Sequence, residues 1–401
     1  MKVFFFHLMP YAEVDLDEVR KVGTSWVKLS NRHYDPEKGA MLYERYLNQL
    51  ERAEELGFDG IGVNEHHQTA YGMMPSPIVM ASSLARRTHR VKICILGSAL
   101  PLRQHPLTLA EEHAMIDTLT RGRLITGFVR GIGAEYHVFG VDPTSSHERF
   151  HEAHDLIIRA WTETGPFEFS GKHYKHRYVN TWPRPYQQPH PPVWIPSQGS
   201  QETIDFAAHP GRRYTYLQTF SPAAAVKKYL DLYRVRAQEY GYIANDSQLG
   251  WAVPIYVGET DESAVAEAKP HFENFRNCFA RMPIEFLLPP GYTSRASMKR
   301  IAAAKKSMFG DLAIEPAMEM GMMVCGSAAT VRDRLIDYFG DMGFGNLIAL
   351  LQFGTLPAAL TDANMDRFAS GVMPALQALG ERPVEQRPSW TTRRPGAASR
   401  R

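Results

Sequence analysis

Eight short runs rich in β-branched and aromatic residues recur along this 401-residue chain, and longer helical patterns separate them. Most of the runs are almost continuously apolar, as expected of strands that have helices on one face and a packed interior on the other. The expected strands are Lys2–Leu8, Gly60–Asn64, Val91–Leu96, Arg123–Val129, Val193–Pro196, Arg213–Gln218, Trp251–Val257 and Asn346–Gln352. This alternation predicts an α/β fold of the (β/α)8 TIM-barrel type. A doubly wound open sheet stays open as an alternative, because periodicity does not determine closure.

Apolar residues recur at helical spacing between these runs. From Met41 to Leu56 they form one apolar face, and Gly57 supplies the stop. We expect further helices at Pro106–Leu119, Phe150–Trp161, Ala223–Tyr240 and Ala329–Met342. The stretch Phe167–Tyr174 is typical of a small hairpin.

Two segments depart from the alternation. Residues 274–324 are too many for a simple crossover, and an insertion of that size before the last strand of a barrel is often a lid or substrate loop. Residues 381–401 are rich in Pro, Arg, Ser and Thr, which is typical of a disordered basic tail. We therefore expect one barrel domain over residues 1–380.

The composition excludes several classes of protein. A formal charge of +2 is too balanced for nucleic acid or an anionic membrane to be the main partner. No apolar run approaches the roughly 20 residues that a membrane span requires. The start of the chain lacks a signal-peptide pattern, and Cys94, Cys278 and Cys325 suit neither a disulfide framework nor a zinc ribbon. We expect a cytoplasmic protein.

Polar residues that follow the strands of a barrel are its functional candidates. The second run ends abruptly in Glu65, His66 and His67, which together can bind an anion, transfer protons or ligate a metal. The alternative is that one or both histidines only bond the loop, with Glu65 orienting an imidazole. Polar residues also follow other runs, namely His7, Ser98, Arg130 and Gln352.

A Gly/Ser loop after the fifth run indicates an anion site. It comprises Ser197, Gln198, Gly199, Ser200, Gln201, Glu202 and Thr203. Backbone N–H groups at a helix start, together with hydroxyls, suit a phosphate, and Arg130 supplies a charge-assisted partner. The alternative for the loop is a helix cap alone.

One motif points to a different class of enzyme. His147, Glu148 and His151 match H-E-x-x-H, in which two histidines on one helix face bind zinc and the glutamate activates water. Here the motif begins a helix whose apolar face contains Phe150 and Trp161, and Ser145-Ser146 suit its N-cap. A solvated helix start explains these residues more simply, so we expect no metal site.

Several short motifs occur in order along residues 1–375. They are Leu56 to Gly60 with Glu65 to His67, Leu96 to Pro101 with His105-Pro106 and Ala110 to Glu112, Leu119 to Arg123 with Gly127 to Gly131, Glu135-Tyr136, Phe139 to Val141, Arg149 to Glu152, Gly171 to Tyr174, Gly326-Ser327 with Val331, Phe353-Gly354 and Val372 to Pro374. In this order they resemble the bacterial luciferase-like flavin monooxygenases.

The resemblance implies a barrel, usually dimeric, that accepts reduced FMN (FMNH2) from a separate flavin reductase. Oxygen would add to the flavin C4a position, and the peroxyflavin would oxygenate a small organic substrate. The family's catalytic histidine falls on His66, which would assist proton transfer. Ser98 and Ala99 would lie near the isoalloxazine ring, while Arg130 and the loop from Ser197 to Thr203 would hold the ribityl phosphate.

The chain departs from the family pattern at two places. Val129 stands where a reactive cysteine often precedes the arginine, and Gln198 stands where luciferases carry an acid, so neither thiol chemistry nor light emission is carried over. A deazaflavin-dependent oxidoreductase, which transfers hydride without oxygen, is the rival on the same fold. Aromatic and Met-rich surroundings favour an apolar substrate.

Overall fold

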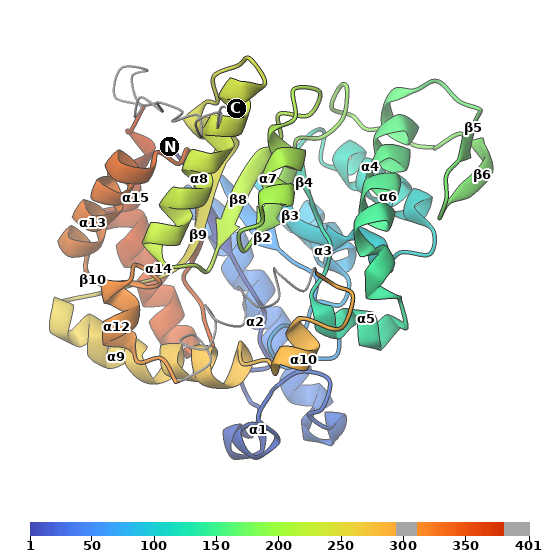
Figure 1. The fold of residues 1–401 in the computed structure, drawn as a ribbon. Coiled ribbons are helices and arrows are strands. Elements are labelled where there is room, and N and C mark those ends of the chain that lie inside the picture. Colours follow the sequence, from blue (N-terminus) through green and yellow to red (C-terminus); the bar gives the residue numbers. More distant parts are fainter. Residues whose placement is uncertain (294–310, 381–401) are drawn as a thin grey trace, which may run out of the picture.

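Eight parallel strands close into a barrel in the computed structural model, which describes residues 1–293 and 311–380 (Figure 1). Pairing runs in the order β9-β11-β1-β2-β3-β4-β7-β8, and β8 pairs again with β9. The barrel strands are β1 (Lys2–Phe6), β2 (Gly60–Val63), β3 (Lys92–Ala99), β4 (Leu124–Val129), β7 (Val193–Ser197), β8 (Thr215–Thr219), β9 (Leu249–Gly258) and β11 (Asn346–Leu350). The predicted (β/α)8 barrel is confirmed, and the open-sheet alternative is wrong.

Aromatic side chains fill the interior of the barrel. The rings of Phe4 on β1 and Trp194 on β7 meet edge to face at 5.1 Å, although their strands are not neighbours in the sheet. All ten residues of β9 are buried. Strands covered on both faces must be apolar throughout, and this explains why the runs in the sequence show no alternation.

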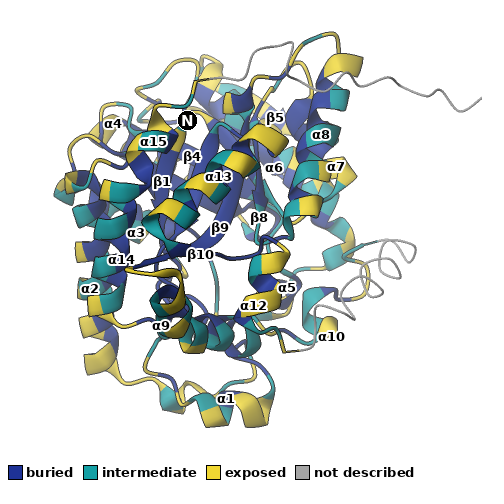
Figure 2. Cartoon of the chain, turned by 90° about the vertical axis from the view of Figure 1, so that its left-hand side faces the viewer, coloured by how far each residue is buried: buried dark blue, intermediate teal, exposed yellow. Residues whose placement is uncertain are grey.

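Helices surround the barrel and bury one face each against the strands, as the dark inner and yellow outer surfaces in Figure 2 show. Their bounds are α1 (Leu16–Val22), α2 (Pro36–Glu55), α3 (Pro77–Arg87), α4 (Pro106–Leu119), α5 (Gly133–Phe139), α6 (Ser146–Thr162), α7 (Gln201–Ala208), α8 (Ala223–Glu239), α9 (Asp261–Asn274), α10 (Ile284–Leu287), α12 (Ile314–Glu319), α13 (Ala328–Met342), α14 (Ala358–Gly371) and α15 (Met373–Gln377). Short helical turns are η1 (Asn31–His33), η2 (Leu100–Leu102), η3 (Pro143–Ser145) and η4 (Asp246–Gln248), and η5 (Phe275–Phe279) is a π-helix.

The first long helix shows how the sequence sets the limits of an element. The Asp35 carboxylate accepts hydrogen bonds from the backbone N–H groups of Glu37 and Lys38, and Pro36 occupies the first turn, where its missing N–H costs nothing. Just past its other end Gly57 has φ +89°, a conformation that glycine adopts without strain. The chain therefore turns directly into β2.

Some predicted limits differ from the structure. The strand expected at Val91–Leu96 continues to Ala99, because a bulge at Gly97 lets the pairing with β4 resume at Ser98. A further strand, β10 (Val324–Ser327), pairs with the outer end of β9 and was not predicted. The hairpin is confirmed as β5 (Phe167–Ser170) and β6 (Lys175–Val179).

The insertion over residues 274–324 begins as a continuation of α9 into η5 and includes α10 and α12. Figure 1 shows α1, α5 and α10 together beyond the end of the barrel opposite the N-terminus. Residues 294–310 of this insertion and the predicted tail at 381–401 lie outside the described residues, so the lid and the tail stay predictions.

Candidate active site

Two histidine–carboxylate pairs stand where β2 ends. Glu65, His66 and His67 follow Asn64 directly after the strand, and the Glu65 side chain is almost fully buried. The two rings keep about an eighth of their surface exposed. Each histidine has a different carboxylate partner, so the two have separate roles.

His66 is paired with a glutamate from another part of the chain. Its Nδ1 lies 3.2 Å from Oε1 of Glu135 on α5. The Glu135 side chain is 1% exposed, and its Oε2 accepts a hydrogen bond from the backbone N–H of Ile132 at 2.9 Å. A buried carboxylate held at both oxygens fixes the orientation of the imidazole.

This pairing sets the tautomer of His66. An ionised carboxylate can only accept, so the proton between the two groups belongs to Nδ1. In the neutral ring Nε2 then carries a lone pair, and no hydrogen bond from the described residues reaches that atom. His66 can therefore take up and release a proton at Nε2.

Glu65 orients His67 rather than His66. Its Oε1 lies 3.0 Å from Nε2 of His67, and its Oε2 accepts a hydrogen bond from the guanidinium of Arg103. The ring of His67 also stands edge-on to Phe139 at 4.6 Å. Because both oxygens of Glu65 already have partners, its direct role is to organise the loop.

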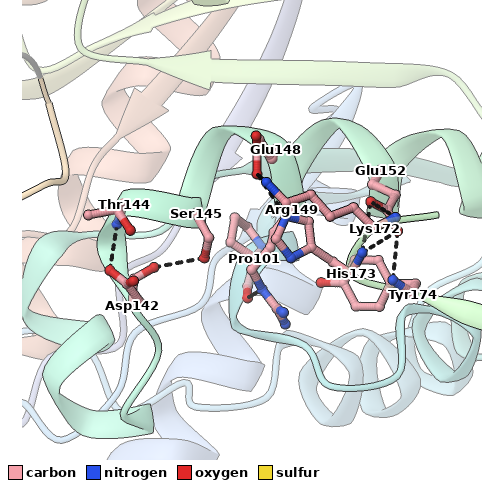
Figure 3. Close-up of polar contacts among 10 residues, drawn as sticks. All are labelled: Pro101, Asp142, Thr144, Ser145, Glu148, Arg149, Glu152, Lys172, His173 and Tyr174. Atoms are coloured by element: carbon pink, nitrogen blue, oxygen red, sulfur yellow. Dashed lines mark hydrogen bonds and ion pairs between the residues drawn. The ribbon is translucent and has the colours of Figure 1, made fainter.

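Arg103 belongs to a segment that α6 and the β5–β6 hairpin hold in place. Figure 3 shows how Arg149 and Glu152 on α6 reach Pro101 and the hairpin. Arg149 on α6 donates to the carbonyls of Pro101 and Arg103, and Glu152 one turn later accepts from the backbone N–H groups of Lys172, His173 and Tyr174. The hairpin closes this framework, since the Tyr174 hydroxyl donates to the carbonyl of Arg103.

Replacing Glu152 by alanine should release the hairpin. Three backbone N–H groups would lose their acceptor, with an expected cost of about 1–3 kcal/mol in the free energy of unfolding. Hydrogen exchange at Lys172 to Tyr174 should become faster. Glu148→Ala is the matched control, because exposed Glu148 contacts only side chains of the same hairpin. Unchanged exchange in Glu152→Ala would contradict this role.

An aromatic wall joins His66 to a cavity of about 130 Å³. The rings of Trp26 and Tyr71 lie 5.2 and 5.1 Å from the ring of His66, both edge to face. Trp26 and Tyr71 also line the cavity, together with Ile132, Gln198, Phe220 and Phe275. The cavity therefore lies between the histidine pair and the Gly/Ser loop after β7.

Arg130 follows β4 and is held in place. Its Nη1 donates to the Ser146 hydroxyl and to the carbonyl of Tyr292, both at 3.1 Å, and its guanidinium lies 4.2 Å from the centre of the Tyr292 ring. The Tyr292 hydroxyl donates in turn to the carbonyl of Gly131. Ser146, taken from the sequence as a helix cap, instead positions this cation, and Ser145 donates to the Asp142 carbonyl rather than capping α6.

The Gly/Ser loop turns into α7 as predicted. The Ser200 hydroxyl accepts from the backbone N–H of Thr203, and the Ser197 hydroxyl accepts from that of Gly199. Gly199 has φ +101°, and a Cβ there would come within 2.2 Å of the Tyr229 ring. The loop thus contains the predicted helix cap, and its backbone conformation requires glycine.

His147 brings the loop and Arg130 together. Its Nε2 lies 3.4 Å from the carboxylate of Glu202 at the start of α7. Burial, and next the nearby positive charge of Arg130, lower the pKa of His147. Arg130, His147 and the starts of α6 and α7 therefore face a common region, to which Arg130 brings a positive charge and α7 brings hydrogen-bond donors.

Ser98 and Ala99 lie inside the end of β3, not after it. The Ser98 hydroxyl is buried 3.4 Å from Nε2 of His113 on α4, so the side chain faces the helix layer. Ala99 packs with Leu102 and Tyr136, and its methyl lies 3.3 Å from the position of a Cβ on Gly131. Of this pair Ala99 thus has its side chain near the mouth.

His7 serves the core. It is fully buried, its Nδ1 accepts from the backbone N–H of Met9, and its Nε2 lies 3.2 Å from Gln49. Gln352 is also buried, with a bond from its amide to the carbonyl of Gly354. Both residues follow strands, as expected.

The three residues of the H-E-x-x-H motif point to different partners. Glu148 pairs with Lys172 at 2.7 Å and with His173 at 3.0 Å, as Figure 3 shows, whereas His147 pairs with Glu202. His151 packs against Phe206 at 5.0 Å. Within residues 1–293 and 311–380, no group of three or more His, Cys, Asp or Glu side chains is arranged to hold a metal ion.

Comparison with known proteins decides the family. The model of the luciferase-like monooxygenases matches residues 25–344. The chain belongs to the luciferase-like monooxygenase family. Among relatives, y4wF of Sinorhizobium fredii is 31% identical over 81% of this chain and 90% of its own. The oxygenase component of the flavin-dependent trigonelline monooxygenase of Acinetobacter baylyi is 26% identical over 85% and 92%.

Several solved structures share the fold of this chain. The oxygenating constituent of 3,6-diketocamphane monooxygenase from Pseudomonas putida, in complex with FMN, has a TM-score of 0.70 at 18% identity, covering 94% of this chain and 98% of that one. An F420-dependent secondary alcohol dehydrogenase has a TM-score of 0.64 at 15% identity, with coverage of 94% and 98%. Flavin and deazaflavin enzymes thus both occur among the neighbours of this luciferase-like chain.

Sequence reasoning missed several residues of the site. Glu135 and Arg149 were noticed only as parts of family motifs, and no signal in the sequence linked Glu135 to His66, 69 positions away. Arg103 and the aromatic pair Trp26 and Tyr71 gave no signal at all.

In the part of the chain that the structure describes, no helix is long and apolar enough to span a bilayer.

Proposed function

We propose that this protein is the oxygenase component of a two-component monooxygenase, which uses FMNH2 from a separate reductase and O2 to oxygenate a small organic substrate. The observation that carries the proposal is that one short segment of the chain joins a candidate phosphate site to a candidate proton-transfer site. Arg130, at the start of this segment, lies in the donor-rich region. Ile132 and Glu135, at its end, position His66. The trigonelline relative, named as an oxygenase component, supports the two-component class.

The donor-rich region fits the phosphate of FMN. Arg130 supplies positive charge, and the start of α7 supplies backbone donors beside the hydroxyls of Ser197 and Ser200. Gln198 lines the cavity, so a flavin held by this loop would extend toward His66. Ala99 would lie beside it, and Ser98 would offer only backbone atoms, because its hydroxyl faces His113.

His66 would manage protons at Nε2. Reduced FMN, when bound, supplies the two electrons that activate oxygen. Glu135 keeps the proton on Nδ1 and stabilises the imidazolium when Nε2 accepts a second one. Glu65 and His67 would hold the loop that presents His66. Trp26 and Tyr71 exclude water from one edge of the ring.

A deazaflavin-dependent oxidoreductase is the second candidate, favoured by the fold neighbour that is F420-dependent. Anaerobic titration with reduced FMN and with reduced F420 separates the two. We expect reduced FMN to bind at least tenfold more tightly. Tighter binding of F420 would overturn the monooxygenase proposal.

Replacing Arg130 by alanine should weaken FMN binding. Loss of a charge-assisted contact to phosphate costs about 1.5–3 kcal/mol, which corresponds to an increase in Kd of about 10- to 100-fold. Riboflavin, which lacks the phosphate, should bind both proteins equally. Arg177→Ala, at an exposed position on the hairpin, serves as the control. An equal loss of affinity for FMN and riboflavin would count against phosphate contact.

Four further parts of the proposal concern assembly, location, movement and substrate. A homodimer, a cytoplasmic location and a closing movement of the insertion at residues 274–324 are expected of this function. The aromatic side chains that line the cavity, which include Trp26 and Phe275, favour a substrate with an apolar body.

A further inference from the structure

The cavity beside His66 contains a cation without a counter-charge. Arg276 lies on the π-helix η5 and lines the cavity with Trp26 and Tyr71. Its Nε atom is buried and has no hydrogen-bond partner among residues 1–293 and 311–380. Single-turn π-helices are frequent at functional sites, because they displace one side chain from the regular helical pattern.

No described carboxylate compensates Arg276. Burial lowers the pKa of its guanidinium, and the ionisable neighbour that acts against this is Tyr71. Burial also raises the pKa of Tyr71, so its phenol is neutral at pH 7. A guanidinium stays charged at neutral pH, and a charge drawn out of water without a partner is costly.

Three other polar side chains of the cavity, Asn277, Arg281 and Asp311, already have partners. The side chain of Asn277 bonds the backbone N–H and carbonyl of Leu312. Arg281 pairs with Asp311 at 3.4 Å, and both side chains are at least half exposed at the rim. Arg276 differs from them because its side chain is partly buried and its Nε has no hydrogen-bond partner among the described residues.

The rest of the lining is apolar and flat. The Phe275 ring stacks on Tyr71 at 6.0 Å and stands edge to face with Phe220 at 6.2 Å. The cavity volume of about 130 Å³ favours a small ligand. The site combines aromatic walls with one partly buried cation, Arg276.

We propose that Arg276 binds a carboxylate of the substrate, and that the substrate is therefore a small aromatic acid whose ring lies among Trp26, Tyr71 and Phe275. A carboxylate matches the fork of a guanidinium in two parallel hydrogen bonds and supplies the missing negative charge. This inference rests on the proposed function, because it treats the cavity as the substrate pocket. It gives Arg276 a role in substrate choice and none in FMN binding.

The test measures binding without any reductant. The full-length protein, loaded with oxidised FMN, is titrated calorimetrically with benzoate, phenylacetate and cinnamate and with their methyl esters. The variants are Arg276→Gln, Arg276→Lys and the control Arg20→Gln. Arg20 is an exposed arginine that contacts Asn274 near the same helical segment and already pairs with Asp17.

We expect at least one acid to bind the wild-type protein ten times more tightly than its ester. Arg276→Gln should abolish that preference with FMN affinity unchanged, Arg276→Lys should keep part of it, and Arg20→Gln should keep all of it. The proposal would be overturned if no acid is preferred to its ester, if Arg276→Gln weakens acid and ester alike, or if it weakens FMN binding. These outcomes do not depend on oxygen chemistry. Failure of the monooxygenase proposal would instead show as an absence of oxygen incorporation into any product with FMNH2 and O2.

Discussion

Replacing His66 by alanine should reduce oxygenation by about 100-fold or more and leave FMN affinity within twofold of the wild type. Positioned proton transfer contributes about 10²- to 10⁴-fold to rates, and Nε2 of His66 is the atom assigned to it. The phosphate region around Arg130 is built from other elements and should not change. Product yield with FMNH2 supplied chemically measures the first effect, and flavin titration measures the second.

Glu135, which pairs with His66, allows a second test of the proton-transfer role. Glu135→Ala should lower kcat with little change in KM, because it frees the His66 ring without touching the cavity. Glu135→Gln keeps one oxygen that can accept from Nδ1 of His66 but loses the acceptor for the Ile132 N–H, so it should restore part of the rate. His137→Ala, on the exposed side of α5, is the control. Full product yield in His66→Ala would reject the proton-transfer role.

Acid should destabilise this protein through its buried histidines. Burial lowers the pKa of His113 and of His7 to about 3, from 6.5 in an unfolded chain. The folded state keeps both neutral, so their contribution is complete above pH 6.5 and is lost as the pH falls toward 3. Between pH 7.5 and 5 each should remove about 2 kcal/mol from the free energy of unfolding, at 1.36 kcal/mol per pKa unit.

The variant His113→Gln isolates this effect. Its stability at pH 7.5 should fall, because the bonds to Thr126 and Ser98 change. When the pH falls from 7.5 to 5, the free energy of unfolding of the variant should nevertheless decrease by about 2 kcal/mol less than that of the wild type. Urea unfolding at the two pH values gives both quantities, with exposed His209→Gln as the control. An unchanged pH difference would show that His113 is protonated in the folded state.

The barrel was predictable because local pattern determines it. Strands buried on both faces must be apolar runs, and Gly57 marks a turn that few other residues adopt. Strand β10 was missed because only four residues pair there, with the outer end of β9 rather than inside the barrel. Likewise β3 includes Ser98 and Ala99, because the strand continues past the bulge at Gly97. The composition predicted that this strand ends at Leu96.

The candidate site was only partly predictable. Residues at strand ends are visible in the sequence, so His66 and Arg130 could be proposed before their contacts were known. Glu135 and Arg276 act through contacts made in three dimensions, from α5 and from a π-helix inside the insertion. Ser146 had a local explanation as a helix cap, and only the structure shows its hydroxyl beneath Arg130.

The most direct test of the monooxygenase proposal follows the oxygen atom. The protein is supplied with FMN, NADH, a flavin reductase and the panel of small aromatic acids under ¹⁸O2, and the products are analysed by mass spectrometry. We expect a product that contains one ¹⁸O atom and forms only in the presence of oxygen. Conversion that proceeds equally well without oxygen, or that requires reduced F420 in place of FMN, would contradict the proposal.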